Sequence, residues 1–169
     1  MTIRPAQASD ASSIAAVSIE VWLGAYMKRG VSAFFADYVL STFTAANTEK
    51  LIADPTQHIL VSQNAEGIDG FIRVSAGSTA PVEGCSDLEI ATFYVQPRHQ
   101  GKGIGARLLD AALGHCRRMR AESVWLTTNA ENSPAIAFYL RKGFEPVGET
   151  HFRIGGESYL NNVYSRRLS

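Results

Sequence analysis

The chain reads Gln100-Gly101-Lys102-Gly103-Ile104-Gly105 where a strand-like pattern over residues 88–95 gives way to a helical pattern over residues 101–118. The first backbone N–H groups of a helix have no partner inside the helix and lie at the positive end of its dipole. Glycines allow an anion to approach these N–H groups closely. The segment therefore predicts a binding site for a phosphate or pyrophosphate group.

Two common phosphate-binding loops do not fit this segment. A Walker-type loop needs a serine or threonine directly after its lysine, whereas Gly103 follows Lys102. A dinucleotide-binding loop follows its strand at once and is paired with an acidic residue at the end of the next strand. Here residues 96–100 intervene after Val95, and the next strand ends in Thr127-Thr128-Asn129. The sequence therefore argues against both types of loop.

The chain contains a second motif further on, Asn132-Ser-Pro-Ala-Ile-Ala-Phe-Tyr139-Leu-Arg-Lys-Gly143-Phe144. Its Ser133-Pro134 pair predicts the start of a helix, with Ser133 as the N-cap, and Gly143 predicts the end. In order and spacing, Gln100-x-x-Gly103-x-Gly105 and this motif resemble the two signatures of the GCN5-related N-acetyltransferase (GNAT) family. From Glu89 onward the chain looks most like polyamine and other small-amine acetyltransferases.

The order of the periodic patterns predicts an α/β fold. Helical patterns occupy residues 9–54, and the chain then forms a hairpin, strand, helix, strand, helix and hairpin over residues 58–76, 88–95, 101–118, 124–128, 133–143 and 144–167. This order predicts one mixed sheet with helices on both faces. Because no linker divides the chain, we expect a single N-acetyltransferase domain over residues 1–169. The resemblance implies the GNAT fold, whose mostly antiparallel sheet contains a splayed pair of parallel strands.

The resemblance implies acetyl-CoA as the cosubstrate, bound between those two strands. It assigns the pyrophosphate to Gln100, Gly101, Lys102, Gly103, Ile104 and Gly105. It assigns the pantetheine arm to the strand at Phe93, Tyr94 and Val95. An exposed N–H on that strand would also polarise the thioester carbonyl. Asn132 has two interpretations, a hydrogen bond to the pantetheine and a turn or capping residue before Pro134.

Tyr139 is the candidate general acid and Glu89 the candidate general base. The pKa of a free thiol is about 8.5 and that of tyrosine about 10, so a phenol can protonate a departing thiolate without large tuning. Spacing alone favours a core position for Tyr139, whereas the family motif favours the acid role. An amine acceptor arrives as an ammonium ion and must lose a proton before attack. Glu89 has two alternatives, a strand-end carboxylate and a substrate-binding one.

The acceptor is predicted to be the primary amine of a small molecule, with a polyamine as one candidate. Trp22 and Tyr26 are one helical turn apart and could form an aromatic wall for a cation. The resemblance places the first helices and the terminal hairpin, with His151, beside the acceptor. The simpler alternative is that the aromatic residues only cover the sheet. Two other functions remain open, a protein or peptide N-acetyltransferase and a non-catalytic acyl-CoA sensor.

The composition of the chain bears on its partners, its metal content and its location. The 169 residues contain 16 Lys+Arg and 16 Asp+Glu, a balance that argues against a nucleic-acid partner. Cys85 and Cys116 have no metal-ligand or disulfide spacing, so we expect reduced thiols, no metal site and a cytoplasmic protein. No apolar run predicts a membrane segment or a secretory leader. The family resemblance also suggests a homodimer.

Overall fold

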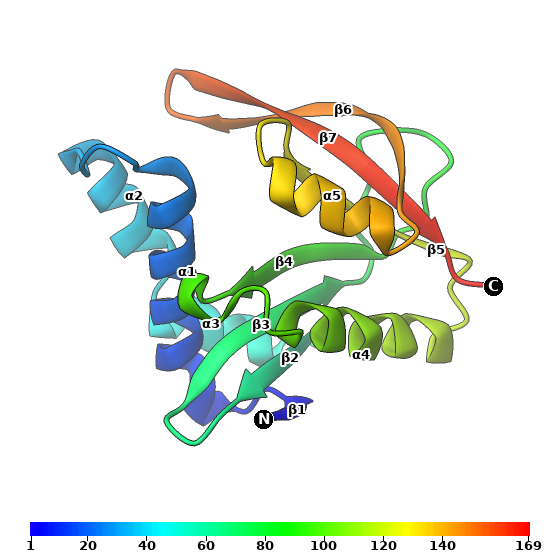
Figure 1. Ribbon diagram of the computed structural model, residues 1–169, viewed down its shortest axis with the longest axis horizontal. Coiled ribbons are helices and arrows are strands. Elements are labelled where there is room, and N and C mark those ends of the chain that lie inside the picture. The colour runs from blue at the N-terminus through cyan, green and yellow to red at the C-terminus, as the bar shows by residue number, and fades with distance from the viewer. The chain divides into compact units, whose positions relative to one another are not determined.

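The computed structural model describes residues 1–169 (Figure 1). Its seven strands are hydrogen-bonded in the order β1-β2-β3-β4-β5-β7-β6. The elements are β1 (Thr2–Pro5), η1 (Ala8–Asp10), α1 (Ala11–Tyr26), α2 (Ala33–Thr42), α3 (Ala45–Ala53), β2 (Gln57–Gln63), β3 (Ile68–Ser75), β4 (Glu89–Val95), η2 (Pro97–His99), α4 (Ile104–Arg118), β5 (Ser123–Asn129), α5 (Ser133–Arg141), β6 (Glu145–Ile154) and β7 (Glu157–Arg167). None of the helices combines the length and the apolar composition needed to cross a membrane.

The sheet is mixed, as the order of sequence patterns predicts. Strands β4 and β5 run parallel, with Glu89 opposite Trp125. The pairs β1–β2, β5–β7 and β6–β7 are antiparallel. The structure therefore confirms the predicted α/β fold with a mixed sheet and a parallel strand pair.

Two local features differ from the sequence prediction. Strand β1 was not predicted, because four residues carry little periodic signal and its pairing, Thr2 opposite Gln63, is distant in sequence. The helix predicted from residue 101 begins instead at Ile104. Gly101 and Gly103 have φ angles of +78° and +83°, in the left-handed region, which a right-handed helix cannot include. The glycine-rich segment is therefore a turn that leads into the helix.

The chain separates into two compact units. The N-terminal unit comprises Met1–Val74 and Thr92–Ala112, and the C-terminal unit comprises Ser75–Ala91 and Leu113–Ser169. Strand β4 and helix α4 contribute residues to both units. The prediction of a single domain over residues 1–169 stays a prediction.

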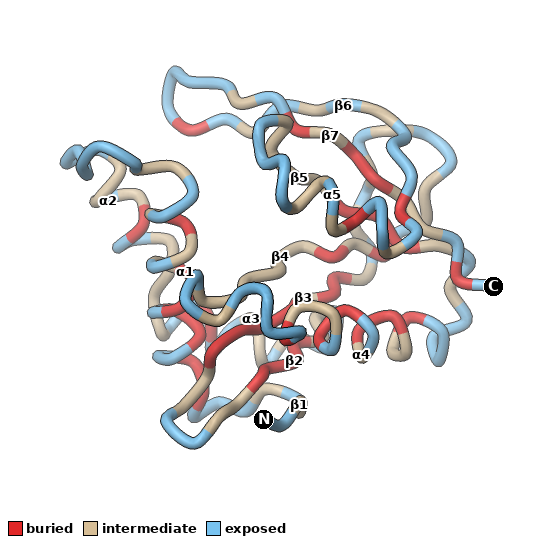
Figure 2. Tube along the Cα trace, viewed as in Figure 1, coloured by how far each residue is buried: buried red, intermediate tan, exposed pale blue.

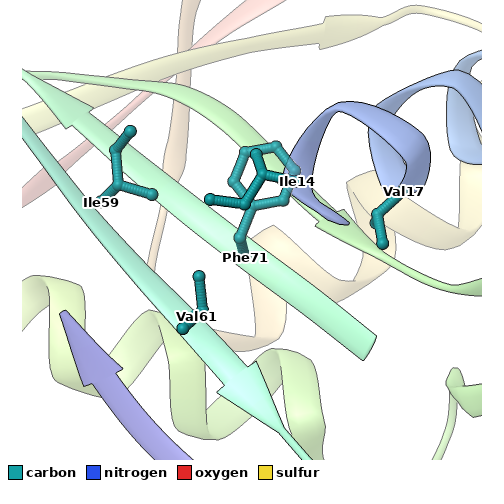
Figure 3. Close-up of a cluster of buried hydrophobic side chains, with 5 residues drawn as sticks. All are labelled: Ile14, Val17, Ile59, Val61 and Phe71. Atoms are coloured by element: carbon teal, nitrogen blue, oxygen red, sulfur yellow. The ribbon is translucent and has the colours of Figure 1, made fainter. Parts of the chain in front are cut away.

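The core of the N-terminal unit lies where α1 packs on β2 and β3 (Figure 3). Ile14 and Val17 come from one face of α1, and they meet Phe71 of β3 together with Ile59 and Val61 of β2. Figure 2 shows buried positions along β2 and β3, and also along α4. Burying a side chain of this size stabilises the fold by about 1.5–3 kcal/mol. This packing fixes the position of β3. Residues of the candidate site lie on β3 and on its neighbour in the sheet, β4.

The core of the C-terminal unit contains side chains of β5 and β7 together with Phe144, which lies between α5 and β6. Leu126, Val163 and Phe144 are all at most 2% exposed. Strand β6 carries an irregularity between Pro146 and Gly148, and a Cβ atom at Gly148 would overlap Val82. The loop that contains Val82 therefore packs against β6.

Candidate functional site

The glycine-rich segment of the N-terminal unit forms an exposed turn at the start of α4. Gln100, Gly101, Lys102 and Gly103 are exposed, whereas the Ile104 side chain is 4% exposed. Because Ile104 is buried, it anchors the helix, and only its backbone faces the turn. Free N–H groups at the start of a 15-residue helix are well suited to bind an anion.

Gln100 links this turn to the end of β4. Its Nε2 donates to the carbonyl oxygen of Val95 at 3.2 Å. At the other end of the turn, the Arg107 N–H donates to the Gly103 carbonyl at 3.1 Å. The two contacts hold the turn between the strand and the first turn of α4. The sequence predicted Gln100 as a phosphate-side residue, and the structure adds this role for its side chain.

A buried carboxylate contacts the segment that precedes the turn, and the sequence analysis did not single it out. Asp69 of β3 is 2% exposed, and its backbone carbonyl accepts from the Gln96 N–H at 2.9 Å. Its Oδ2 lies 3.7 Å from His99 Nδ1 and 3.1 Å from Asn64 Nδ2. The available signal was a single acidic residue between Ile68 and Gly70 in a largely apolar strand.

Strand β4 carries the three residues predicted to contact pantetheine, Phe93, Tyr94 and Val95, all of them partly buried. Side-chain alternation turns Tyr94 to the opposite side from Phe93 and Val95. The Tyr94 ring meets Phe71 edge-on, with ring centroids 5.7 Å apart. Burial, reinforced by the neighbouring phenols of Tyr26 and Tyr38, raises the pKa of Tyr94 to about 12. The Tyr94 hydroxyl is therefore neutral at pH 7.

The aromatic residues of α1 and α2 form a cluster centred on Trp22. Its ring centroid lies 4.8 Å from that of Tyr26, 5.2 Å from Tyr38 and 5.9 Å from Phe35. Trp22 is 3% exposed, whereas Tyr26 and Tyr38 are partly exposed. Within the N-terminal unit, the tyrosines are thus better placed than Trp22 to meet a ligand. A hydrogen bond of 2.8 Å from Gln96 to Glu20 links α1 to the end of β4.

Tyr139 of the C-terminal unit lies on α5 and is 8% exposed. Its ring centroid is 5.7 Å from that of Phe144 and 6.3 Å from that of Tyr164. Helix α5 begins with Asn132 as its N-cap, whose Oδ1 accepts from the Ala135 N–H at 3.3 Å. The prediction of Ser133 as the cap was wrong, because Ser133 is already the first helical residue. The structure shows the capping role of Asn132.

Glu89 is the first residue of β4 and is partly buried. It lies opposite Trp125 of β5, and Trp125 lies opposite Ser165 of β7. Partners in register share a face of a sheet, and successive residues alternate between faces. Glu89 therefore shares a face with Ser165, whereas Tyr164, which contacts Tyr139, points to the other face.

Two buried polar atoms lie on the face of Glu89 and were not predicted. Trp125 Nε1 and Asn161 Oδ1 are both buried without a hydrogen-bond partner. Asn161 lies opposite Asn129, four residues along β5 from Trp125, so the two share a face. His151 lies exposed opposite Leu160, whose register places it on the face of Tyr164 instead. The structure thus does not bring His151 to the face of Glu89.

The fold and these motifs agree with the comparison with known proteins. The model of the "Acetyltransferase (GNAT) family" matches residues 26–144. The chain therefore belongs to the GNAT acetyltransferase family.

Individual relatives match over shorter regions. The chain is 32% identical over 108 residues to the N-alpha-acetyltransferase RimI of Mycobacterium tuberculosis. The matched region covers 62% of this chain and 64% of that protein. It is 34% identical over 61 residues to a spermine/spermidine N(1)-acetyltransferase of Bacillus subtilis. This matched region covers 36% of this chain and 40% of that protein. The chain thus spans less than two thirds of these relatives.

A solved structure matches over nearly the whole chain. The PaiA N-acetyltransferase of Thermoplasma acidophilum, crystallised in complex with coenzyme A, superposes with a TM-score of 0.75 over 99% of both chains at 17% sequence identity. At this identity, the likeness supports the fold alone.

Proposed function

We propose that this protein is an acetyl-CoA-dependent N-acetyltransferase that acts on the primary amine of a small molecule. One observation carries the proposal: the exposed turn Gln100–Gly103 leads into α4 inside the region that matches the family model. In this proposal, the backbone N–H groups from Gln100 to Gly105 bind the pyrophosphate, and the Lys102 ammonium adds positive charge. The β4 backbone from Phe93 to Val95 pairs with the pantetheine.

The proposed chemistry is direct transfer in a ternary complex. The bound thioester supplies an activated acetyl carbonyl. The Glu89 carboxylate takes a proton from the acceptor ammonium, and the free amine attacks the carbonyl carbon. As the C–S bond breaks, the Tyr139 hydroxyl gives its proton to the leaving sulfur. The nitrogen of the adduct then loses its second proton, which restores the Tyr139 hydroxyl, and Glu89 returns its proton to water. No covalent intermediate on the enzyme is required.

Glu89 and Tyr139 serve different reactants in this proposal. An incoming amine and a departing thiolate need different proton-transfer partners at different atoms. The register places Trp125, the partner of Glu89, and Tyr164, the neighbour of Tyr139, on opposite faces of the strands, so the two proposed groups do not contact each other.

A polyamine is the acceptor that we propose first. Aromatic rings bind cations through their faces, and Tyr26 and Tyr38 are the partly exposed tyrosines of the aromatic cluster in the N-terminal unit. The similarity to the Bacillus spermine/spermidine enzyme supports this acceptor class. The longer match to RimI favours a second candidate, the N-terminal amine of a peptide.

We also propose that residues 1–169 act as one N-acetyltransferase domain, because the family match includes residues of both units. Cys85 and Cys116 are free thiols, which supports a reducing, cytoplasmic location. The homodimer suggested by the family resemblance is tested by light scattering on the purified protein.

Calorimetric titration of the protein with acetyl-CoA, with NADH as the control ligand, tests the proposed cosubstrate. Saturable binding of acetyl-CoA alone supports the proposal, and no binding overturns it. Release of free thiol is then followed with spermidine, spermine and a short peptide in parallel. Turnover with the polyamines supports the first acceptor, and turnover with the peptide alone supports the second. Binding without turnover of any amine would favour the acyl-CoA sensor.

A further inference from the structure

Asp69 is a buried acidic residue of β3. Its side chain is 3% exposed, and its Oδ1 is buried without a hydrogen-bond partner. Its Oδ2 accepts a hydrogen bond from Asn64 and lies within ion-pair distance of the His99 imidazole, at 3.7 Å. Burying a carboxylate is unfavourable unless charged or hydrogen-bonding partners compensate. An aspartate at this position therefore calls for a physical reason beyond packing.

The contacts of Asp69 converge on the short segment that carries the glycine turn. The backbone carbonyl of Asp69 accepts from the Gln96 N–H at the start of this segment, and its carboxylate faces His99 at the end. His99 is followed directly by Gln100, the first residue of the turn. One residue of β3 thus contacts both ends of residues 96–99.

Asn64 extends these contacts to the turn between β2 and β3. Its Oδ1 accepts from the N–H groups of Glu66 and Gly67, at 2.8 Å and 3.0 Å, while its Nδ2 donates to Asp69. The carboxylate is therefore held by the β2–β3 turn on one side and faces the short segment 96–99 on the other. This arrangement allows Asp69 to set the position of His99 relative to the sheet.

We propose that Asp69 is a positioning residue for the pyrophosphate-binding turn, and that it acts through His99 and Gln96. The inference rests on the proposed function, because it assumes that the turn Gln100–Gly103 binds coenzyme A. Backbone donors recognise an anion well only when they are held within about 0.5 Å of the productive geometry. In this proposal Asp69 fixes the position of residues 96–99, which lead into the turn, and does not itself contact the anion.

The test compares Asp69→Asn, His99→Gln and the double variant with the unaltered protein. Each single substitution is expected to raise the Kd for coenzyme A and the KM for acetyl-CoA by about 5-fold. The value of kcat and the KM for the amine should change by less than about 2-fold, because Asp69 and His99 are assigned no role in the chemistry. The double variant should bind coenzyme A no more weakly than the single variants, because both substitutions break the same contact between Asp69 and His99.

Asp10→Asn is the matched control. Asp10 is another largely buried carboxylate of the N-terminal unit, and its partner is Arg4, at 2.8 Å. The control is expected to lower the melting temperature and to leave the Kd for coenzyme A unchanged. Should Asp69→Asn fail to fold, the partly exposed His99→Gln still provides the comparison.

The possible outcomes separate this inference from the proposed function. If the unaltered protein does not bind coenzyme A, the proposed function itself fails. If it binds, but His99→Gln and Asp69→Asn bind equally well, the positioning role is overturned and the proposed function stands. A loss of affinity that Asp10→Asn reproduces at an equal loss of stability also overturns the positioning role.

Discussion

The Glu89 side chain and the Tyr139 ring lie on opposite faces of the strands of the C-terminal unit. Glu89 is in register with Trp125, and Tyr139 packs against Tyr164, one residue along β7 from the partner of Trp125. Since successive strand residues alternate between faces, this one-residue offset separates the two side chains. The proposed base and acid therefore do not contact each other, and each can be tested alone.

Replacing Tyr139 with phenylalanine removes the hydroxyl and keeps the ring that packs against Phe144 and Tyr164. We expect kcat to fall by about 100-fold, because the leaving thiolate loses its proton donor. The Kd for acetyl-CoA should be unchanged. Steady-state kinetics and calorimetry on the same preparation give both values. An unchanged kcat would show that Tyr139 is only a core residue.

Replacing Glu89 with glutamine should alter the pH dependence of the reaction. At pH 7 an amine with a pKa of about 10 is protonated, so loss of the base should lower kcat/KM by about 100-fold. At higher pH the acceptor loses its proton to solvent, and the difference from the unaltered enzyme should shrink. A pH–rate profile of both proteins measures this. Parallel profiles would instead indicate that Glu89 only binds substrate.

Gly103→Ala tests the backbone conformation of the turn. Gly103 has a φ angle of +83°, and an alanine in this left-handed region is disfavoured by about 1–2 kcal/mol. No atom lies within 4 Å of the added Cβ, so the effect is conformational rather than a clash. We expect the Kd for coenzyme A to rise by about 10-fold.

The control for that prediction is Gly24→Ala in helix α1. Gly24 also has open space around an added Cβ, and no positive φ angle is found there. This substitution should raise the free energy of unfolding by about 0.5–1 kcal/mol, since alanine favours a helix over glycine. The Kd for coenzyme A should stay the same. Equal Kd values of the two alanine variants for coenzyme A would show that the conformation of Gly103 does not matter for binding.

We expect Trp22→Ala to act mainly by destabilising the folded protein, and not through the loss of a direct contact to the acceptor. Trp22 is 3% exposed and lies among aromatic rings, so its removal should lower the free energy of unfolding by about 3–5 kcal/mol. Phe34→Ala is the control, because Phe34 is 54% exposed and should change stability by about 0.5 kcal/mol or less. Urea unfolding curves measure both. A stable Trp22→Ala protein with a raised amine KM would restore Trp22 as a direct acceptor contact.

Tyr94 predicts a loss of stability in alkali. The pKa of tyrosine is about 10 in the unfolded chain, and burial raises the pKa of Tyr94 to about 12 in the folded protein. The unfolded state therefore releases this proton first, so the stabilising contribution is complete below about pH 10 and is lost as the pH rises toward 12. Unfolding at about pH 9 and about pH 11 should show a smaller loss for Tyr94→Phe than for the unaltered protein. An equal loss would assign the alkaline effect to other groups.

Much of the fold was predictable from the sequence, because its signals are local. The two family motifs, the helical periods and the hairpin turns lie in short segments, and they led to the α/β fold and to the family. The cap at Asn132 and the start of α4 at Ile104 were missed by one and three residues. At these boundaries neighbouring residues compete for the same local role, and periodicity does not rank them. Strand β1 was missed because only its distant partner β2 defines it.

The sequence by itself determined which chemical groups this protein carries: a glycine turn before a helix, a tyrosine in a family motif and a carboxylate at the start of a strand. Only the tertiary structure decided how they are related. The register of β5 and β7 separates Glu89 from Tyr139, and the packing of α1 and α2 buries Trp22. Asp69 faces His99 although 30 residues separate them. Such relationships depend on pairing and packing between distant segments, which a local pattern does not encode.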